Sequence, residues 1–221
     1  TLEGAGTKTV TGLVADLTLA ASNTGTTSVT TGDASLTINA DAAAGALTVD
    51  GAALAEGKTL TLTGGATTTT AAVNNLKADL VATSLASALT VDLADDTVDN
   101  AISVTTGTHT TTINDSAAGD TITVNAAAIA DNVLLTTAGA GAFSINDLQG
   151  NLSNTASGAV SVTLADNTDG AYTVNSTTAI TVNNGTAQDG DTITLEGAGN
   201  KTVTGLVADL TLDSSNTGTT G

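Results

Sequence analysis

The sequence predicts an all-β fold, a parallel β-solenoid (β-helix) built from diverged repeats of about 60–70 residues. Three observations favour this fold class. Apolar residues alternate with Thr at period two in short segments, which is the pattern of strands with one buried and one solvated face. The sequence also repeats itself, and its 221 residues include one Phe, one Tyr and no Trp or Met. Without large aromatic side chains, the interior should be thin and filled by Val, Leu, Ile, Ala and Thr.

Strands are expected at intervals of roughly 8 to 12 residues, separated by turns rich in Asn, Asp, Gly and Ser. In chain order, the alternation is clear at 35–39, 46–50, 58–63, 88–93, 101–105, 120–124, 160–164, 172–174, 179–182 and 191–195. Segment 72–87 carries Val and Leu at helix-compatible spacing, but the corresponding positions of the other repeats have Gly or β-branched neighbours. We therefore interpret this segment as strand and turn.

Internal repetition gives the domain organisation. Residues 1–28 return as residues 194–221 at an offset of 193, with 24 of 28 positions identical. Two weaker copies of the motif lie between them, and the four copies end at leucines spaced 63, 72 and 58 residues apart: Leu17, Leu80, Leu152 and Leu210. This spacing predicts one superperiod at 1–193, the start of the next at 194–221, and three diverged β-repeats within the first at about 1–61, 62–133 and 134–193.

A string of small β-sandwiches is the competing architecture. Immunoglobulin-like sandwiches need about 100 residues and a buried aromatic side chain, whereas the units here are shorter and nearly free of aromatics. In a solenoid, equivalent residues such as Val10 and Val73, or Leu13 and Leu76, should point inward. Two or three strands per coil, at about 4.8 Å per coil, predict a length on the order of 35–50 Å.

Composition excludes several kinds of partner. The net charge is −18, from 22 acidic residues against four lysines and no arginine, so no nucleic acid partner is expected. No stretch of 18 apolar residues occurs, so we expect no membrane insertion in this segment. The chain has no Cys and therefore no disulfide framework. Self-association with neighbouring repeats or chains is the expected interaction, because stacked repeats bury each other's strand edges.

Acidic residues in two matching loops are the candidate metal ligands: Asp95, Asp96, Asp99, Asp166 and Asp169. Ca²⁺ takes six to eight oxygen ligands, and loops of this kind can supply carboxylates. The same residues are also ordinary turn formers, because a short carboxylate bonds the local backbone. The sequence leaves both interpretations open, and Ca²⁺ is the single cofactor considered.

Threonine supplies the second candidate surface, since Thr-x-Thr segments stacked on a flat solenoid face resemble several ice-binding proteins. Thr is also a good strand former whose hydroxyl keeps a solvated sheet face soluble. The inventory for catalysis is small, with no Arg or Cys, one Tyr, and one His, His109, in an expected strand. We therefore expect no enzymatic activity.

The chain resembles large repetitive secreted bacterial surface proteins, namely S-layer proteins and adhesins that include relatives of the RTX class. The resemblance rests on the acidic, Arg-free, Thr/Ala/Gly/Asn/Asp-rich composition and on recurrent GDTIT, LTVD and ITVN strands. It implies an extracellular, cell-surface location, often with calcium stabilisation. The expected function is a structural repeat region that forms a stalk, fibre or S-layer-type lattice. The alternative is an adhesin segment that binds ice or a glycan through its Thr-rich faces.

Overall fold

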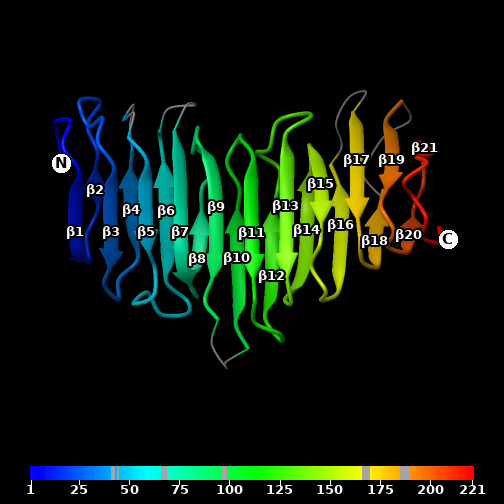
Figure 1. Ribbon diagram of the computed structural model, residues 1–221, viewed down its shortest axis with the longest axis horizontal. Coiled ribbons are helices and arrows are strands. Elements are labelled where there is room, and N and C mark those ends of the chain that lie inside the picture. The colour runs from blue at the N-terminus through cyan, green and yellow to red at the C-terminus, as the bar shows by residue number, and fades with distance from the viewer. Residues whose placement is uncertain (41–42, 44, 66–68, 96–98, 166–169, 185–189) are drawn as a thin grey trace.

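The computed structural model is an elongated stack of β-strands with the two termini at opposite ends (Figure 1). It describes residues 1–221 except 41–42, 44, 66–68, 96–98, 166–169 and 185–189. The described residues form 21 strands in two parallel sheets. They form no helix, and hence none that is long and apolar enough to cross a membrane.

The eleven-stranded sheet, here sheet I, contains the odd-numbered strands: β1 (Lys8–Leu13), β3 (Thr27–Thr31), β5 (Leu47–Asp50), β7 (Thr70–Leu76), β9 (Ala88–Leu93), β11 (Thr111–Asp115), β13 (Leu134–Gly139), β15 (Asn151–Asn154), β17 (Ala171–Ser176), β19 (Thr192–Glu196) and β21 (Asp209–Leu212). The ten-stranded sheet, sheet II, contains the even-numbered strands: β2 (Leu17–Thr18), β4 (Leu36–Asn39), β6 (Thr59–Thr63), β8 (Asp79–Val81), β10 (Ala101–Thr105), β12 (Thr121–Asn125), β14 (Ala142–Leu148), β16 (Val160–Leu164), β18 (Ile180–Asn183) and β20 (Lys201–Thr204).

Consecutive strands alternate between the sheets, so two strands and two corners make one coil. Residues paired across neighbouring coils are 16 to 24 positions apart in sequence, as in Leu148↔Leu164 and Leu47↔Ala71. Sheet I has ten strand spacings, which at about 4.8 Å each give a length of about 48 Å. This arrangement confirms the predicted parallel β-solenoid. The alternative of separate sandwiches is wrong, because each sheet is paired continuously from one end of the molecule to the other.

A narrow core lies between the sheets and is filled mainly by aliphatic side chains in stacked columns. Val10, Val29, Val49 and Val73 form one such column through the pairings of β1, β3, β5 and β7. Val73 and Leu76 are fully buried, whereas Val10 and Leu13, at the end of the stack, pack against the core and stay partly exposed. Inward orientation of these equivalent residues is therefore confirmed.

The two aromatic residues are both inside. Phe143 and Tyr172 are 2% and 1% exposed, and the Tyr172 hydroxyl donates a hydrogen bond of 2.8 Å to the carbonyl oxygen of Ala165. This bond satisfies the buried phenol, as buried tyrosines require. The thin interior therefore holds one residue of each type without an unpaired hydroxyl.

The recurring sequence motif has a structural counterpart at the end of β1, β7, β14 and β20. Each copy reads Val or Ile, two residues, then Leu, and the residue before the Leu has a positive φ: Gly12 (63°), Asn75 (56°), Asp147 (54°) and Gly205 (65°). The strand register shifts at the first three of these sites. Gly, Asn and Asp are the residues that tolerate this left-handed conformation, so the motif encodes a bulge at a tight corner. Segment 72–87, interpreted as strand and turn, contains most of β7 and all of β8.

Candidate functional surfaces

Rows of hydroxyl side chains run along the outer faces of both sheets, perpendicular to the strands. In sheet II, paired positions on six successive strands are Ser103, Thr123, Ser144, Ser161, Thr181 and Thr202. In sheet I, the row is Thr9, Ser28, Thr48, Thr90, Thr112, Thr136 and Ser153, interrupted by Ala72 in β7. Period-two alternation produces these rows, because each apolar neighbour turns inward. Each row offers hydrogen-bonding groups at the spacing of the strands and without charge.

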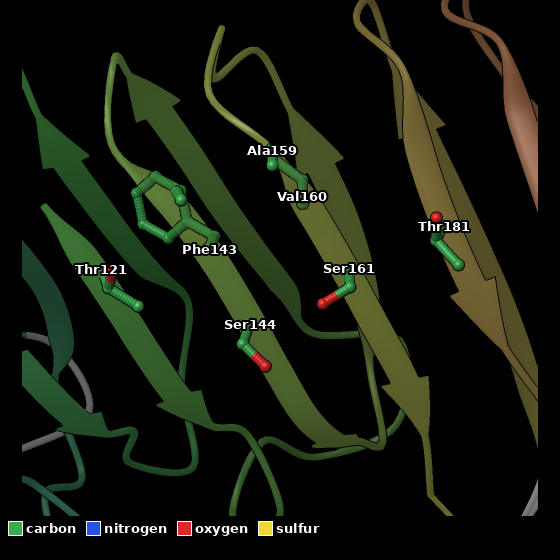
Figure 2. Close-up of a pocket in the computed structure, with 8 residues that line it drawn as sticks. Thr121, Phe143, Ser144, Ala159, Val160, Ser161 and Thr181 are labelled. Carbon is green, nitrogen blue, oxygen red and sulfur yellow. The ribbon is translucent and has the colours of Figure 1, made fainter. Parts of the chain in front are cut away.

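A shallow depression of about 300 Å³ lies on sheet II over β12, β14, β16 and β18 (Figure 2). Small side chains create it, and the residues that line it are Thr121, Ala142, Phe143, Ser144, Ala159, Val160, Ser161 and Thr181. Its polar side chains are hydroxyls of Thr and Ser, and its lining has no carboxylate, imidazole or amine. Such a lining can accept a weakly bound polar ligand but offers no general acid or base.

The acidic corner, defined as Asp95, Asp99, Asp115 and Asp120, lies where the chain passes from sheet I to sheet II in two successive coils. Asp115 and Asp120 are 0% and 1% exposed. Oδ1 of Asp115 accepts a hydrogen bond from the N–H of Ala117 (3.3 Å), and Oδ1 of Asp120 accepts one from the N–H of Asn100 (2.7 Å). Among the described residues, the buried Oδ2 atoms of both aspartates have no hydrogen-bond partner.

The acidic corner perturbs the protonation of one of its buried carboxylates, Asp115. Burial, together with the nearby charges of Asp120 and, to a smaller extent, Asp95, raises the pKa of Asp115 from 3.8 to about 6. The hydrogen bond from Ala117 opposes this shift. The corner therefore binds a proton more readily than an exposed aspartate does, and additional positive charge would stabilise it.

Of the five predicted calcium ligands, Asp96, Asp166 and Asp169 lie outside the described residues. Asp95 and Asp99 are exposed. The Asp99 carboxylate lies against Gly119, where an added Cβ would be 2.2 Å from Oδ1, so Asp99 adjoins the loop that carries Asp115 and Asp120. The described residues contain no group of three or more Asp, Glu, His or Cys side chains arranged to hold a metal ion. Calcium binding stays a prediction.

Sequence reasoning missed the two aspartates that the fold buries. Asp120 was visible as part of the Gly-Asp-Thr-Ile-Thr segment, but nothing in that pattern distinguishes a buried carboxylate from a turn residue. His109 was also misplaced. It lies in the connection between β10 and β11, not in a strand, and its Nδ1 is 2.8 Å from Oγ1 of Thr108.

Each copy of the 28-residue segment has one lysine that donates hydrogen bonds to the carbonyl oxygens of its glycine-rich corner. Nζ of Lys8 donates to the carbonyl oxygens of Gly4 (2.5 Å) and Gly6 (2.6 Å). Nζ of Lys201 donates to those of Gly197 and Gly199, both at 2.7 Å. Lys201 is 1% exposed, also donates to the carbonyl oxygen of Ser176 in the preceding coil (3.3 Å), and has its pKa lowered by burial. Each lysine ammonium group therefore holds together the glycine carbonyls of its own loop.

Both ends of the stack are open. β1 and β21 are the edge strands of sheet I, each with one neighbour. Apolar side chains are exposed here, with Val14 at 60%, Val207 at 59% and Leu212 at 53%. Val14 and Val207 are equivalent positions of the two 28-residue copies. The two ends therefore expose unpaired backbone edges and similar apolar surface.

Comparison with known proteins gave no significant match to any family model, curated protein or solved structure.

Proposed function

We propose that this chain is an extracellular structural segment of a giant bacterial surface protein, which forms a stalk, fibre or S-layer-type lattice by stacking end to end. The observation that carries the proposal is that the first and last coils of the solenoid are copies of one 28-residue segment with equivalent strand pairings. The extracellular location and bacterial origin rest on composition, that is, on the acidic, Cys-free and Arg-free sequence.

The chain itself shows how a coil packs on the repeated 28-residue segment. The first copy, residues 1–28, ends at the start of β3 and is covered on one side by the rest of β3, by β4 and by the strands that follow. The second copy, residues 194–221, has the same sequence at 24 of 28 positions and no following strand. A second copy of the repeat, placed as β3 and β4 are placed on the first, supplies the missing backbone partners. This supports an array whose coils continue across each junction.

A structural role also agrees with the chemistry of the surfaces. The polar side chains of the depression on sheet II are all hydroxyls, and His109 lies in a corner loop beside Thr108. The second candidate function is an adhesin segment that binds ice or a glycan, and the hydroxyl rows on both sheets favour it.

The test compares one-, two- and three-repeat chains, in which residues 29–221 follow residue 221 directly so that each junction shares one 28-residue segment. Small-angle scattering should show one rod that lengthens by about 45 Å for each added 193-residue repeat. The melting temperature should rise with repeat number, since neighbouring coils stabilise one another. Separate bodies of equal melting temperature would contradict the proposal.

A matched pair of variants isolates the open edge. Leu212→Lys places a charge on the exposed edge strand β21, and Thr123→Lys places one on an exposed face position of β12. Self-association of the 221-residue chain should fall with Leu212→Lys and stay unchanged with Thr123→Lys. Equal association of both variants would exclude the β21 edge as the contact. Retention of either variant on ice or immobilised glycans would instead favour the adhesin.

A further inference from the structure

The two copies of the 28-residue segment lie on opposite sheets. Lys8 pairs with Thr27 in sheet I, whereas its equivalent Lys201, in β20 of sheet II, pairs with Thr220. Likewise, Leu2 pairs with Leu19 beside β2 of sheet II, whereas the equivalent Leu195 and Leu212 pair between β19 and β21 of sheet I. Each strand of the second copy has thus exchanged its sheet.

The local structure of the two copies is the same in spite of this exchange. The N–H of Lys8 donates to the carbonyl of Thr26 (2.9 Å), and the N–H of Lys201 to that of Thr219 (2.8 Å). The N–H of Gly4 donates to Oγ of Ser22 (3.4 Å), and Gly197 to Ser215 (3.3 Å). Both lysine ammonium groups hold equivalent glycine carbonyls. One coil therefore occurs twice, the second time turned by half a turn about the long axis.

The spacing of the bulge motif explains the half-turn. The motif ends β1, β7, β14 and β20, so its copies are six, seven and six strands apart among the described strands. The middle interval, 72 residues against 63 and 58, contains the additional strand. Because successive strands alternate between sheets, an odd total of nineteen strands moves the motif to the other sheet. β1 and β7 lie in sheet I, and β14 and β20 lie in sheet II.

We propose that each repeat docks on the preceding one rotated by half a turn about the fibre axis, so that equivalent surfaces alternate between the two faces of the array. This inference rests on the end-to-end stacking proposed above and fixes its geometry. The partner is a second copy of this chain's own repeat, and its docking surface is the open C-terminal edge formed by β21 and the Thr220 segment beside β20.

Close backbone contacts at the second copy match those that fix the next coil on the first. A Cβ at Gly25 would lie 2.4 Å from the carbonyl oxygen of Gly6, and one at the equivalent Gly218 would lie 2.2 Å from that of Gly199. On the first copy, the following coil brings Gly45 equally close, with its Cβ position 2.0 Å from the oxygen of Gly25. Gly218 is the equivalent of Gly25 at the other corner of the solenoid, so a following coil can pack against Gly218 as Gly45 packs against Gly25.

The hydroxyl rows continue through such a junction. Thr202, in the row on sheet II, is the equivalent of Thr9, which begins the row on sheet I. In the array, the sheet II row of one repeat therefore passes into the sheet I row of the next. Both faces of a long array carry the same chemistry over two repeats, and neither face is dedicated to a ligand.

The test uses a two-repeat chain that contains the full sequence and, in the second repeat, residues 29–221. The chain has no Cys, so introduced cysteines can be biotinylated specifically and marked with streptavidin for electron microscopy. Thr123 in sheet II and Thr90 in sheet I are exposed positions. With Thr123→Cys in both repeats, the two marks should lie on opposite faces of the rod. With Thr123→Cys in the first repeat and Thr90→Cys in the second, they should lie on the same face.

The two labelled chains have similar axial separations between marks, so any twist of the solenoid affects both alike. A continuous rod with the reverse pattern, same face for the Thr123 pair and opposite faces for the mixed pair, would overturn the half-turn and leave end-to-end stacking intact. Two bodies joined by a flexible junction would overturn the proposed stacking and the half-turn together.

Discussion

Removing the charge of Asp115 should stabilise the protein at neutral pH. Asp115→Asn keeps the shape of the side chain and the oxygen that accepts the hydrogen bond from Ala117, and it replaces the buried, unpartnered Oδ2 by an NH₂ group. This group faces a corner that already contains the Asp120 carboxylate. The substitution therefore removes an uncompensated buried charge and supplies a donor near a remaining one.

The pKa of Asp115 determines the magnitude and the sign of the change in stability that Asp115→Asn should cause. Its folded-state pKa of about 6 lies above the ordinary 3.8. At about 1.4 kcal/mol per unit, the ionised carboxylate costs up to about 3 kcal/mol, and solvent screening reduces this to about 1–3 kcal/mol. Because the acid's pKa is raised, its contribution to stability is complete below pH 3.8 and is lost as the pH rises through 6. Asp115→Asn should therefore be more stable than the unsubstituted protein at pH 7.5 and equally stable at pH 3.5.

Thermal melts by circular dichroism between pH 3.5 and 7.5 measure this difference. At pH 7.5, Asp115→Asn should raise the melting temperature by about 2–12 °C, on the scale of about 2–4 °C per kcal/mol for a chain of this size. Asp147→Asn removes the same charge from an exposed position and serves as the matched control. Equal melting temperatures of the two variants at pH 7.5, or a gain in the melting temperature of Asp115→Asn that is the same at every pH, would contradict this prediction.

Three further predictions concern the corners of the solenoid. Gly45→Ala should destabilise the fold by about 1–3 kcal/mol, because the added Cβ would lie 2.0 Å from a backbone oxygen. Gly6→Ala, whose Cβ would have nothing within 4 Å, should leave the stability unchanged. Equal melting temperatures of the two variants would refute the close stacking of the coils. Lys201→Met should lower the free energy of unfolding, measured by chemical denaturation, by about 1–3 kcal/mol, because it leaves buried carbonyls unpaired. Lys58→Met, at a partly exposed site, should change it by about a few tenths of a kcal/mol. Similar losses in the two variants would contradict a structural role of Lys201. A chelator should lower the melting temperature of protein prepared with Ca²⁺, since a ligand specific to the folded state stabilises it; an unchanged curve would leave the acidic loops as turns.

The β-solenoid could be predicted because its causes are local. Alternation at period two specifies strands with one buried face, and repetition specifies that these strands stack on copies of themselves. The bulge motif was visible as a repeated Val-x-x-Leu pattern, although its meaning depends on the third residue. Asn75 and Asp147 replace Gly12 and Gly205 there because all four have a positive φ.

The exchange of sheets between repeats could not be predicted in the same way. It depends on whether the chain makes an odd or an even number of strands in 193 residues, and short strands such as β2 and β8, of two and three residues, decide that number. Their sequences do not distinguish a strand from a turn. The burial of Asp115 and Asp120 is equally non-local, because it arises from the coils stacked above and below their loop.

The orientation of the backbone hydrogen bonds determines how this solenoid responds to tension along its long axis. Because the bonds join one coil to the next, they run along the long axis, and tension applied between the two ends loads them one coil at a time. A coil of about 20 residues that detaches from an end releases about 70 Å of chain in place of 4.8 Å of stack. Under load, the molecule therefore extends in steps and dissipates energy while the remaining coils stay folded. Single-molecule force spectroscopy should record a series of small extension steps of similar length, whereas cooperative unfolding of the whole stack would give one large step.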